Sequence, residues 1–350
     1  MRIAQIAPLT ESVPPTLYGG TERIVSYLTE ELTSLGHDVT LFASGDSVTT
    51  ATLEPMAPRA LRFDTSLRDA IAPHMVMMEA VYRRAHEFDV LHFHLDYWSF
   101  SLFSRGPTPS LTTLHGRLDL PEHKPMYDMF PRAPLVSISF AQRRGMPDAN
   151  YVKTIHHGIP TNLLTPQLVT PGYLAFLGRI APEKRPDRAI RIARRAGMKL
   201  KIAAKVDRVD QGYFDAKIRP MIDGDQIEMI GEIGDAQKAA FLGGAHALLM
   251  PIDWPEPFGL VMIEAMACGT PVIAFNCGSV PEIVDDGLTG FVVDSEDAAV
   301  AAVPRLQRLS RAAIRTRFER RFSARRMAGD YVSLYREMAI SARPRLRVVS

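Results

Sequence analysis

The stretch Asp253–Phe275 constrains the fold of this chain more than any other. It reads D-W-P-E-P-F-G-L-V-M-I-E-A-M-A-C-G-T-P-V-I-A-F. Prolines on both sides hold Glu256 in an extended turn, and the second, Pro257, suits the first position of a helix, where its missing N–H is not needed. A glycine and a further proline predict that this helix ends near Cys268. The apolar run Val272–Phe275 is then typical of a buried parallel strand.

Two carboxylates lie within this stretch. Glu264 interrupts an otherwise apolar helix, where a glutamate is rarely buried without a partner, so we expect something to bind it. Glu256 precedes it by eight residues, or about 12 Å at the helical rise, which suits an elongated ligand with hydroxyls at both ends. The helix start, with the N–H groups of Phe258, Gly259 and Leu260, would attract negative charge. The alternative is an amphipathic helix that shows Glu264 to water, with Glu256 as a loop residue.

The pattern E-P-F-G-L-x-x-x-E-A-M-A-x-G-x-P-V-I-A resembles the signature of the retaining glycosyltransferases of family 4. That family has the GT-B fold and uses nucleotide-activated sugars. The resemblance implies that Glu256 holds hydroxyls of the donor sugar and that Glu264 holds the ribose. It also implies that the amides of Phe258, Gly259 and Leu260 line the diphosphate and the sugar. The expected fold is α/β, with two Rossmann-like domains facing a central cleft.

The length of 350 residues favours two domains. A boundary is predicted at Ile159–Gly172, which carries three prolines among polar residues and has no periodic pattern. We therefore expect an N-terminal acceptor domain over residues 1–160 and a C-terminal donor domain over residues 173–322. The resemblance implies that a final helix, residues 323–340, packs back on the first domain.

The first half begins with a strand, a loop and a helix, which is typical of an alternating α/β fold. Gly19 and Gly20 lie at the helix entry, where glycines let the backbone approach an anion, although a plain tight turn fits them equally well. The resemblance places this loop close to the donor phosphates and the acceptor. A further helix is predicted over Thr65–Glu87. The sequence contains no G-x-G-x-x-G, which argues against a dinucleotide dehydrogenase.

Histidines gather at the predicted carboxyl ends of strands, at His92, His94, His115 and His157. Open α/β sheets bind ligands at these ends. We do not expect zinc at His92 and His94, because alternate strand residues commonly just pack and no carboxylate or cysteine pair completes a ligand set. His115, followed by a glycine, resembles the acceptor-side histidine of the family, whereas His157 resembles a structural junction.

The second half repeats the strand, loop and helix order. Arg179 and Lys184 flank the loop, where both could reach one anion and stabilise a departing diphosphate. The following helix is basic throughout, and we expect most of its arginines to be solvated: Arg185, Arg188, Arg191, Arg194 and Arg195. By resemblance, the stretch ending at Ile233 contacts the nucleotide base through its backbone.

The charge and the cysteine content limit the classes of binding partner and the cellular compartment that the sequence favours. A net charge of +2 gives no argument for nucleic acid. The basic segment Pro304–Arg326 fits either adhesion to an anionic membrane or a solvated helix face, and we expect the latter. Two cysteines, Cys268 and Cys277, exclude a disulfide framework and fit a cytoplasmic protein. The first apolar run is too short for a signal peptide, and no window reaches the roughly 20 apolar residues of a membrane helix, so any membrane contact would be peripheral, at the inner face.

The expected function is therefore retaining transfer of a hexose from a nucleotide sugar, of the UDP-glucose type first and GDP-mannose next, to a hydroxyl of a sugar, lipid or small-molecule acceptor. By resemblance, Glu256, His115, Arg179 and Lys184 serve catalysis, which would be largely electrostatic. No D-x-D motif lies near the predicted site, so we expect no metal cofactor. The alternatives are a sugar-nucleotide epimerase or isomerase of the same fold and a non-catalytic sugar-nucleotide binder. The sequence does not indicate an oligomeric state.

Overall fold

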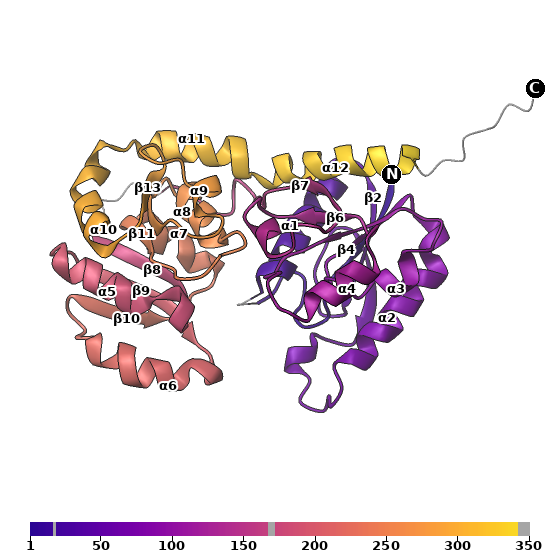
Figure 1. Cartoon of the computed structure of the whole chain (residues 1–350), viewed down its shortest axis with the longest axis horizontal. Coiled ribbons are helices and arrows are strands. Elements are labelled where there is room, and N and C mark those ends of the chain that lie inside the picture. Colours follow the sequence, from indigo (N-terminus) through magenta and orange to yellow (C-terminus); the bar gives the residue numbers. More distant parts are fainter. Residues whose placement is uncertain (17–18, 167–171, 342–350) are drawn as a thin grey trace, which may run out of the picture. The chain divides into compact units, whose positions relative to one another are not determined.

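The computed structural model describes residues 1–16, 19–166 and 172–341. The chain divides into two compact units (Figure 1). The first unit comprises Met1–Ile138, Arg143–His157 and the chain from Ala324 onward, and the second comprises Ser139–Gln142 and Gly158–Ser323. The short segment Ser139–Gln142 thus belongs to the second unit, although the first unit surrounds it in the sequence.

The first unit is built on a parallel sheet. Within the described residues the sheet has seven strands in the order β3-β2-β1-β4-β5-β6-β7. The strands are β1 (Arg2–Ile6), β2 (Asp38–Ser44), β3 (Thr52–Ala57), β4 (Val90–Phe93), β5 (Ser110–Thr113), β6 (Leu135–Ser137) and β7 (Tyr151–Thr154). The strand order reverses between β1 and β4, so the loops that follow these two strands diverge and leave room for a ligand at their carboxyl ends. The sequence did not predict β3, because Pro55 interrupts its pattern; an edge strand tolerates proline.

Helices cover this sheet. They are α1 (Gly20–Ser34), α2 (Ile71–Arg84), α3 (Phe100–Phe103), α4 (His123–Met129) and α12 (Ala324–Ser341). The predicted helix over Thr65–Glu87 begins too early: α2 starts at Ile71, whose N–H donates to the Asp69 carboxylate at 2.8 Å. The C-terminal helix α12 packs on α1 and β4, and its side chains Tyr331 and Tyr335 are fully buried.

The second unit repeats the arrangement. Within the described residues, six parallel strands lie in the order β10-β9-β8-β11-β12-β13. The strands are β8 (Tyr173–Ile180), β9 (Leu200–Val206), β10 (Ile227–Gly231), β11 (Ala245–Met250), β12 (Val272–Phe275) and β13 (Gly290–Val293). The helices are α5 (Pro186–Arg195), α6 (Gln211–Tyr213), α7 (Asp235–Gly243), α8 (Leu260–Ala267), α9 (Val280–Ile283), α10 (Glu296–Ala302) and α11 (Arg311–Phe322). The order reverses between β8 and β11, which makes the loops after these two strands the expected binding place. The predicted α/β fold of two Rossmann-like domains is confirmed.

The helix that carries Glu264 starts later than predicted. α8 begins at Leu260 and not at Pro257, because Gly259 has a φ of 79° and turns the chain just before the helix. This left-handed backbone angle is one that glycine adopts without strain. The helix ends at Ala267, close to the predicted end.

The basic helices are tied into the structure. The expectation that the α5 arginines are mostly solvated holds for Arg194 and Arg195, which are exposed, but not for the others, which are only partly exposed. Each of the five also forms an ion pair, such as Arg185 with Asp253 at 2.7 Å. In α11 the Arg315 guanidinium donates to the backbone carbonyls of Thr161, Leu164 and Ala267. Several arginines of the basic segment therefore bind protein groups and do not form a purely solvated face. No helix in the described part of the chain is long and apolar enough to cross a bilayer.

Candidate functional site

The loops after β8 and β11 bring two predicted site residues together. The Lys184 ammonium forms an ion pair with the Oε2 atom of Glu256 and lies 4.6 Å from the centre of the Trp254 ring. The indole N–H of Trp254 donates to the same carboxylate oxygen at 3.0 Å. We call these three residues the Lys184 cluster. Trp254 was not among the predicted site residues, although an aromatic residue two positions before Glu256 is a signal for a cation–π partner.

The Arg179 guanidinium pairs with three carboxylates outside this cluster. Its guanidinium is 2.7 Å from the Glu183 carboxylate, 3.5 Å from that of Asp207 and 3.6 Å from that of Asp210. Three carboxylates thus share its charge. A phosphate at Arg179 would compete with them, and the idea that Arg179 and Lys184 hold one anion stays a prediction.

The loop that carries Glu256 is fixed from several sides within the second unit. The Ser139 hydroxyl donates to the carbonyl of Pro257 at 2.6 Å, and the Ser279 N–H donates to the carbonyl of Glu256 at 3.0 Å. Gly278 has a φ of 57°, and a Cβ atom there would lie 2.5 Å from the Glu256 carbonyl oxygen. The Glu256 side chain is therefore presented by a loop with little freedom to move.

The start of α8 offers hydrogen-bond donors. Gly259 and Leu260 are partly exposed, and no described residue accepts from their amides. The first N–H groups of a helix have no intrahelical partner and carry partial positive charge. These two amides can therefore receive an anion. Phe258 precedes them and is buried.

Glu264 has a partner within the protein that was not predicted. Its side chain is 4% exposed, and its Oε1 atom lies 2.7 Å from the Lys238 ammonium of α7. That ammonium is also 3.2 Å from the Asp235 carboxylate. The protein itself thus supplies the group we expected to bind Glu264, so burial of this carboxylate is not evidence of a ligand. The sequence places Asp235 and Lys238 three residues apart on one helix, but this spacing does not predict that α7 packs on α8.

The predicted base-contacting residue follows β10. Ile233 lies between β10 and α7, at the carboxyl edge of the second sheet. Gly231, with a φ of 82°, turns the chain just before it. Ile233 is thus on the same edge of the sheet as the Lys184 cluster.

In the first unit, Gly19 precedes α1. Its φ is 151°, and a Cβ atom there would lie 2.7 Å from Pro15 Cβ, so the turn needs glycine. Gly20 is the first residue of α1. The turn lies after the carboxyl end of β1, next to the point where the strand order reverses.

His115 lies at the carboxyl end of β5. Its Nε2 atom is 2.9 Å from Nδ1 of His94, and its ring stacks on that of His157 with centroids 5.2 Å apart. Burial lowers the pKa of His115 to about 3, which keeps the ring neutral at ordinary pH. Both ring nitrogens of His92 and of His94 contact other side chains of the first unit.

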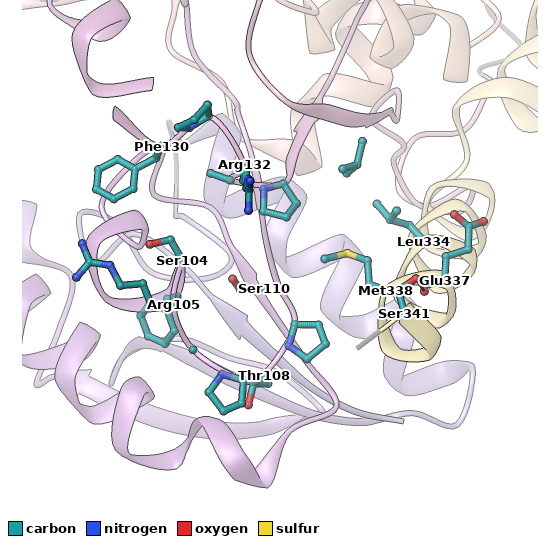
Figure 2. A pocket seen from close by; sticks show the side chains of 18 of the residues that line it. Ser104, Arg105, Thr108, Ser110, Phe130, Arg132, Leu334, Glu337, Met338 and Ser341 are labelled. Carbon is teal, nitrogen blue, oxygen red and sulfur yellow. Dashed lines mark hydrogen bonds between the residues drawn. The ribbon is translucent and has the colours of Figure 1, made fainter. Parts of the chain in front are cut away.

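A pocket in the first unit lies away from these residues. It has a volume of about 740 Å³ and lies at the amino ends of β5 and β6. Figure 2 shows Leu334, Glu337 and Met338 of α12 on one side of it and Phe130 and Arg132 on the other. Because ligands of open α/β sheets bind at the carboxyl ends of strands, this pocket is not the candidate site.

Known proteins resemble the chain over nearly its whole length. The description "Glycosyltransferase Family 4" matches residues 18–163, and "Glycosyl transferases group 1" matches residues 166–320. The phosphatidyl-myo-inositol mannosyltransferase of Mycobacterium leprae (strain TN) is 26% identical and is aligned over 97% of this chain and 98% of its own. The D-inositol 3-phosphate glycosyltransferase of Streptomyces scabiei (strain 87.22) is 34% identical over 41% of this chain, and the match spans only 33% of that relative.

A solved structure shows the same fold. Anabaena HepE, crystallised with UDP and glucose, superposes with a TM-score of 0.74 over 96% of this chain and 100% of its own, at 16% identity. The two family descriptions together cover both units, and the two parallel sheets have the strand order of Rossmann-like domains. The chain therefore belongs to the GT-B glycosyltransferases of family 4.

Proposed function

We propose that this protein is a retaining glycosyltransferase that moves a hexose from a nucleotide sugar to a hydroxyl acceptor. The observation that carries the proposal is the Lys184 cluster, which lies where the strand order of the second sheet reverses. The amides of Gly259 and Leu260, which donate to no described residue, follow it in the same loop. Cationic and N–H donors thus converge with a carboxylate, and a sugar diphosphate needs both.

The cluster can bind a donor without being dismantled. Lys184 has three N–H donors, so it can keep its contact with Glu256 and still donate to a phosphate oxygen. The Oε2 atom of Glu256 accepts from both Lys184 and Trp254, which leaves Oε1 for a hydroxyl of the donor sugar. As the glycosidic bond breaks, negative charge grows on the diphosphate, where Lys184 and the amides of Gly259 and Leu260 stabilise it.

The nucleotide would extend toward α7. Lys238 contacts Oε1 of Glu264, so Oε2 is the acceptor that remains for a ribose hydroxyl. Ile233 would contact the base through its backbone, and Arg179 would reach the phosphates after releasing its carboxylates. Within the first unit, His115 stays the predicted catalytic residue, and Gly19 and Gly20 stay the predicted donor-binding residues.

The names of the relatives and of the solved structure support proposals for the donor and the acceptor. UDP-glucose is the first candidate, supported by the UDP and glucose of Anabaena HepE. GDP-mannose is the second, because the Mycobacterium leprae relative is named a mannosyltransferase. The Streptomyces scabiei and Mycobacterium leprae relatives are both named for inositol-containing substrates. A polyol, its phosphate or a lipid that carries it should therefore head the acceptor screen. We propose that basic residues make a metal unnecessary and that the reaction takes place in the cytoplasm, with or without peripheral contact with the membrane.

Thermal unfolding with UDP-, GDP-, ADP- and dTDP-sugars tests the proposal, first with EDTA and then with magnesium. A donor at about 100 times its Kd should stabilise the protein by about 2.7 kcal/mol. Lys184→Met should abolish the shift. Lys201→Met should preserve it, because Lys201 lies on β9, where its partner is Glu228 at 3.5 Å.

A turnover assay distinguishes glycosyl transfer from the alternative functions. With the stabilising donor and the acceptor screen, the product should keep the anomeric configuration of the donor, as read by NMR. Binding without turnover would favour the non-catalytic sugar-nucleotide binder, and conversion of the donor sugar without an acceptor would favour the epimerase or isomerase. No shift from any nucleotide sugar in the folded protein would overturn the proposal.

A further inference from the structure

Arg185 holds an unusual backbone conformation next to the Lys184 cluster. Its φ is 53° and its ψ is 51°, which is the left-handed region. The Cβ atom makes this conformation unfavourable for residues other than glycine, and asparagine and aspartate tolerate it best among them. Arg185 also precedes Pro186, and the residue before a proline is ordinarily extended. Such a conformation persists only where other contacts hold it.

The side chain of Arg185 supplies contacts of this kind. Its Nε and Nη2 atoms donate to the two carboxylate oxygens of Asp187, each at 3.1 Å, and its Nη1 atom donates to Asp253 at 2.7 Å. Asp187 lies in the first turn of α5 and also accepts from Arg191 and Tyr213. One guanidinium therefore ties its own residue both to α5 and to the loop after β11.

The left-handed residue sets the direction of the chain between two elements. A 3₁₀ turn, Pro182–Lys184, ends just before Arg185, and α5 begins just after it. α5 is anchored in the core of the second unit through side chains such as Ile190, which is fully buried. The backbone angles of Arg185 therefore decide how the turn, with Lys184 at its end, is directed relative to the sheet.

The turn meets the loop that carries Glu256. The N–H of Asp253 donates to the carbonyl of Glu183 at 2.9 Å, and the next residue of the turn supplies the ammonium of the Lys184 cluster. The contact of Arg185 with Asp253 lies beside both in the sequence. The left-handed turn thus delivers Lys184 to its partners from a fixed direction.

We propose that Arg185 is a positioning residue for Lys184, whose ammonium it directs toward Glu256 and toward the diphosphate of the donor. The diphosphate part rests on the proposed glycosyl transfer, whereas the direction toward Glu256 does not. Arg185 acts through its backbone: two carboxylates stabilise the left-handed conformation, and this conformation places Lys184. The guanidinium is already bound by Asp187 and Asp253, so it is not the group that receives the phosphate.

Glycine and alanine at position 185 separate this role from that of an ordinary ion pair. Both remove the guanidinium. Glycine adopts the left-handed conformation without strain, whereas alanine retains the penalty of a Cβ atom and has no contact that offsets it. Arg185→Gly should therefore keep Lys184 in place, and Arg185→Ala should let the turn relax and move Lys184 away. Arg185→Asn should resemble Arg185→Gly, since asparagine tolerates this conformation.

Arg194 provides the matched control. It lies on α5, is exposed, and pairs with Asp223 at 3.4 Å. Its backbone is helical, and in a helix glycine is less favourable than alanine. Neither Arg194→Gly nor Arg194→Ala should disturb the Lys184 cluster, and the glycine variant should be the less stable of the two. At position 185 we expect the opposite order.

The first measurement is the indole ¹H–¹⁵N NMR signal of Trp254 in the full-length protein without any ligand, assigned with Trp98→Phe. The Trp254 ring centre lies 4.6 Å from the Lys184 ammonium, and its N–H donates to Glu256, so the signal reports where the ammonium lies. Lys184→Met gives the signal of a cluster without the ammonium. Arg185→Ala should move most of the way toward this reference, and Arg185→Gly should stay near the unaltered protein.

Donor binding is the second measurement. The probe for isothermal titration is UDP-glucose, or GDP-mannose if that is the donor that stabilises the unaltered protein. Arg185→Ala should bind it about tenfold more weakly, which corresponds to the penalty of the left-handed conformation for a residue with a Cβ atom. Arg185→Gly should bind it within about threefold of the unaltered protein.

Three results would overturn the inference: an unchanged Trp254 signal in Lys184→Met or in Arg185→Ala, an equal displacement of that signal in Arg185→Gly and Arg185→Ala, or equal donor affinities of these two variants. The last two would make Arg185 an ordinary ion-pair residue. Arg185→Asn takes the place of Arg185→Gly if the glycine variant does not fold. If the Trp254 signals are as expected and no nucleotide sugar binds the unaltered protein, the proposed function fails and the positioning of Lys184 stands.

Discussion

Removing the Lys238 ammonium should destabilise the second unit far more than neutralising its partner Glu264. In Lys238→Met the Glu264 carboxylate stays in a site where it is 4% exposed, and its ion-pair partner at 2.7 Å is gone. Breaking a buried pair in this way costs about 3–5 kcal/mol. In Glu264→Gln the ammonium keeps Asp235 at 3.2 Å and an amide oxygen, so the expected cost is only about 1–2 kcal/mol.

Two further variants complete the experiment. Lys238→Met with Glu264→Leu replaces both charges by apolar groups, which is often neutral, so stability should return to within about 1 kcal/mol of the unaltered protein. Lys201→Met is the control at a partly exposed lysine and should cost about 1 kcal/mol or less, because its pair with Glu228 at 3.5 Å is partly open to water and its contact with the Tyr173 ring, at 4.8 Å, is weak.

Urea unfolding can read the second unit alone. The sequence has two tryptophans, Trp98 in the first unit and Trp254 in the second. In a Trp98→Phe background, the fluorescence of Trp254 reports the second unit and yields its free energy of unfolding. In thermal unfolding followed in the same way, a loss of 3 kcal/mol should lower the Tm of this unit by roughly 6 °C or more. Equal costs for Lys238→Met and Glu264→Gln, or a cost below about 1 kcal/mol for Lys238→Met, would refute the reasoning.

Three other outcomes can be checked with the same protein. Gly278→Ala should displace the Glu256 loop, because the added Cβ would lie 2.5 Å from the Glu256 carbonyl oxygen; isothermal titration should show weaker donor binding, and unchanged affinity would contradict this. Burial raises the pKa of the Cys268 thiol to about 12, so a thiol reagent should label it at pH 8 only after unfolding; fast labelling of the native protein would count against the buried site. Burial also lowers the pKa of five histidines in the first unit from the usual 6.5: His74, His92, His94, His115 and His157. The unfolded state then binds more protons below pH 6.5, so stability should be full above that pH and fall below it by up to about 1.4 kcal/mol per pH unit for each histidine. Denaturant unfolding followed through Trp98 should show this loss, and equal stability at about pH 7.5 and about pH 5.5 would exclude it.

The sequence alone determined the features that depend on neighbours along the chain. The alternation of apolar strands with helices predicted two Rossmann-like domains, because strand and helix periods are local properties. Prolines and glycines marked the Glu256 loop and the end of α8 for the same reason. Two predictions of element positions failed for local reasons. Gly259 delays the start of α8, and β3 tolerates Pro55 because that strand lies at the edge of its sheet.

Only the tertiary structure decided which side chains meet. No pattern in the sequence around Glu264 predicts Lys238 as its partner, because α7 meets α8 through tertiary packing. Gln5 and Tyr335 are 330 positions apart, and the order of strands around β1 and β4, with α12 packed on β4, brings them into contact. Composition and motifs specify which groups can donate or accept, but a buried polar group takes its partner from whichever element the fold places beside it.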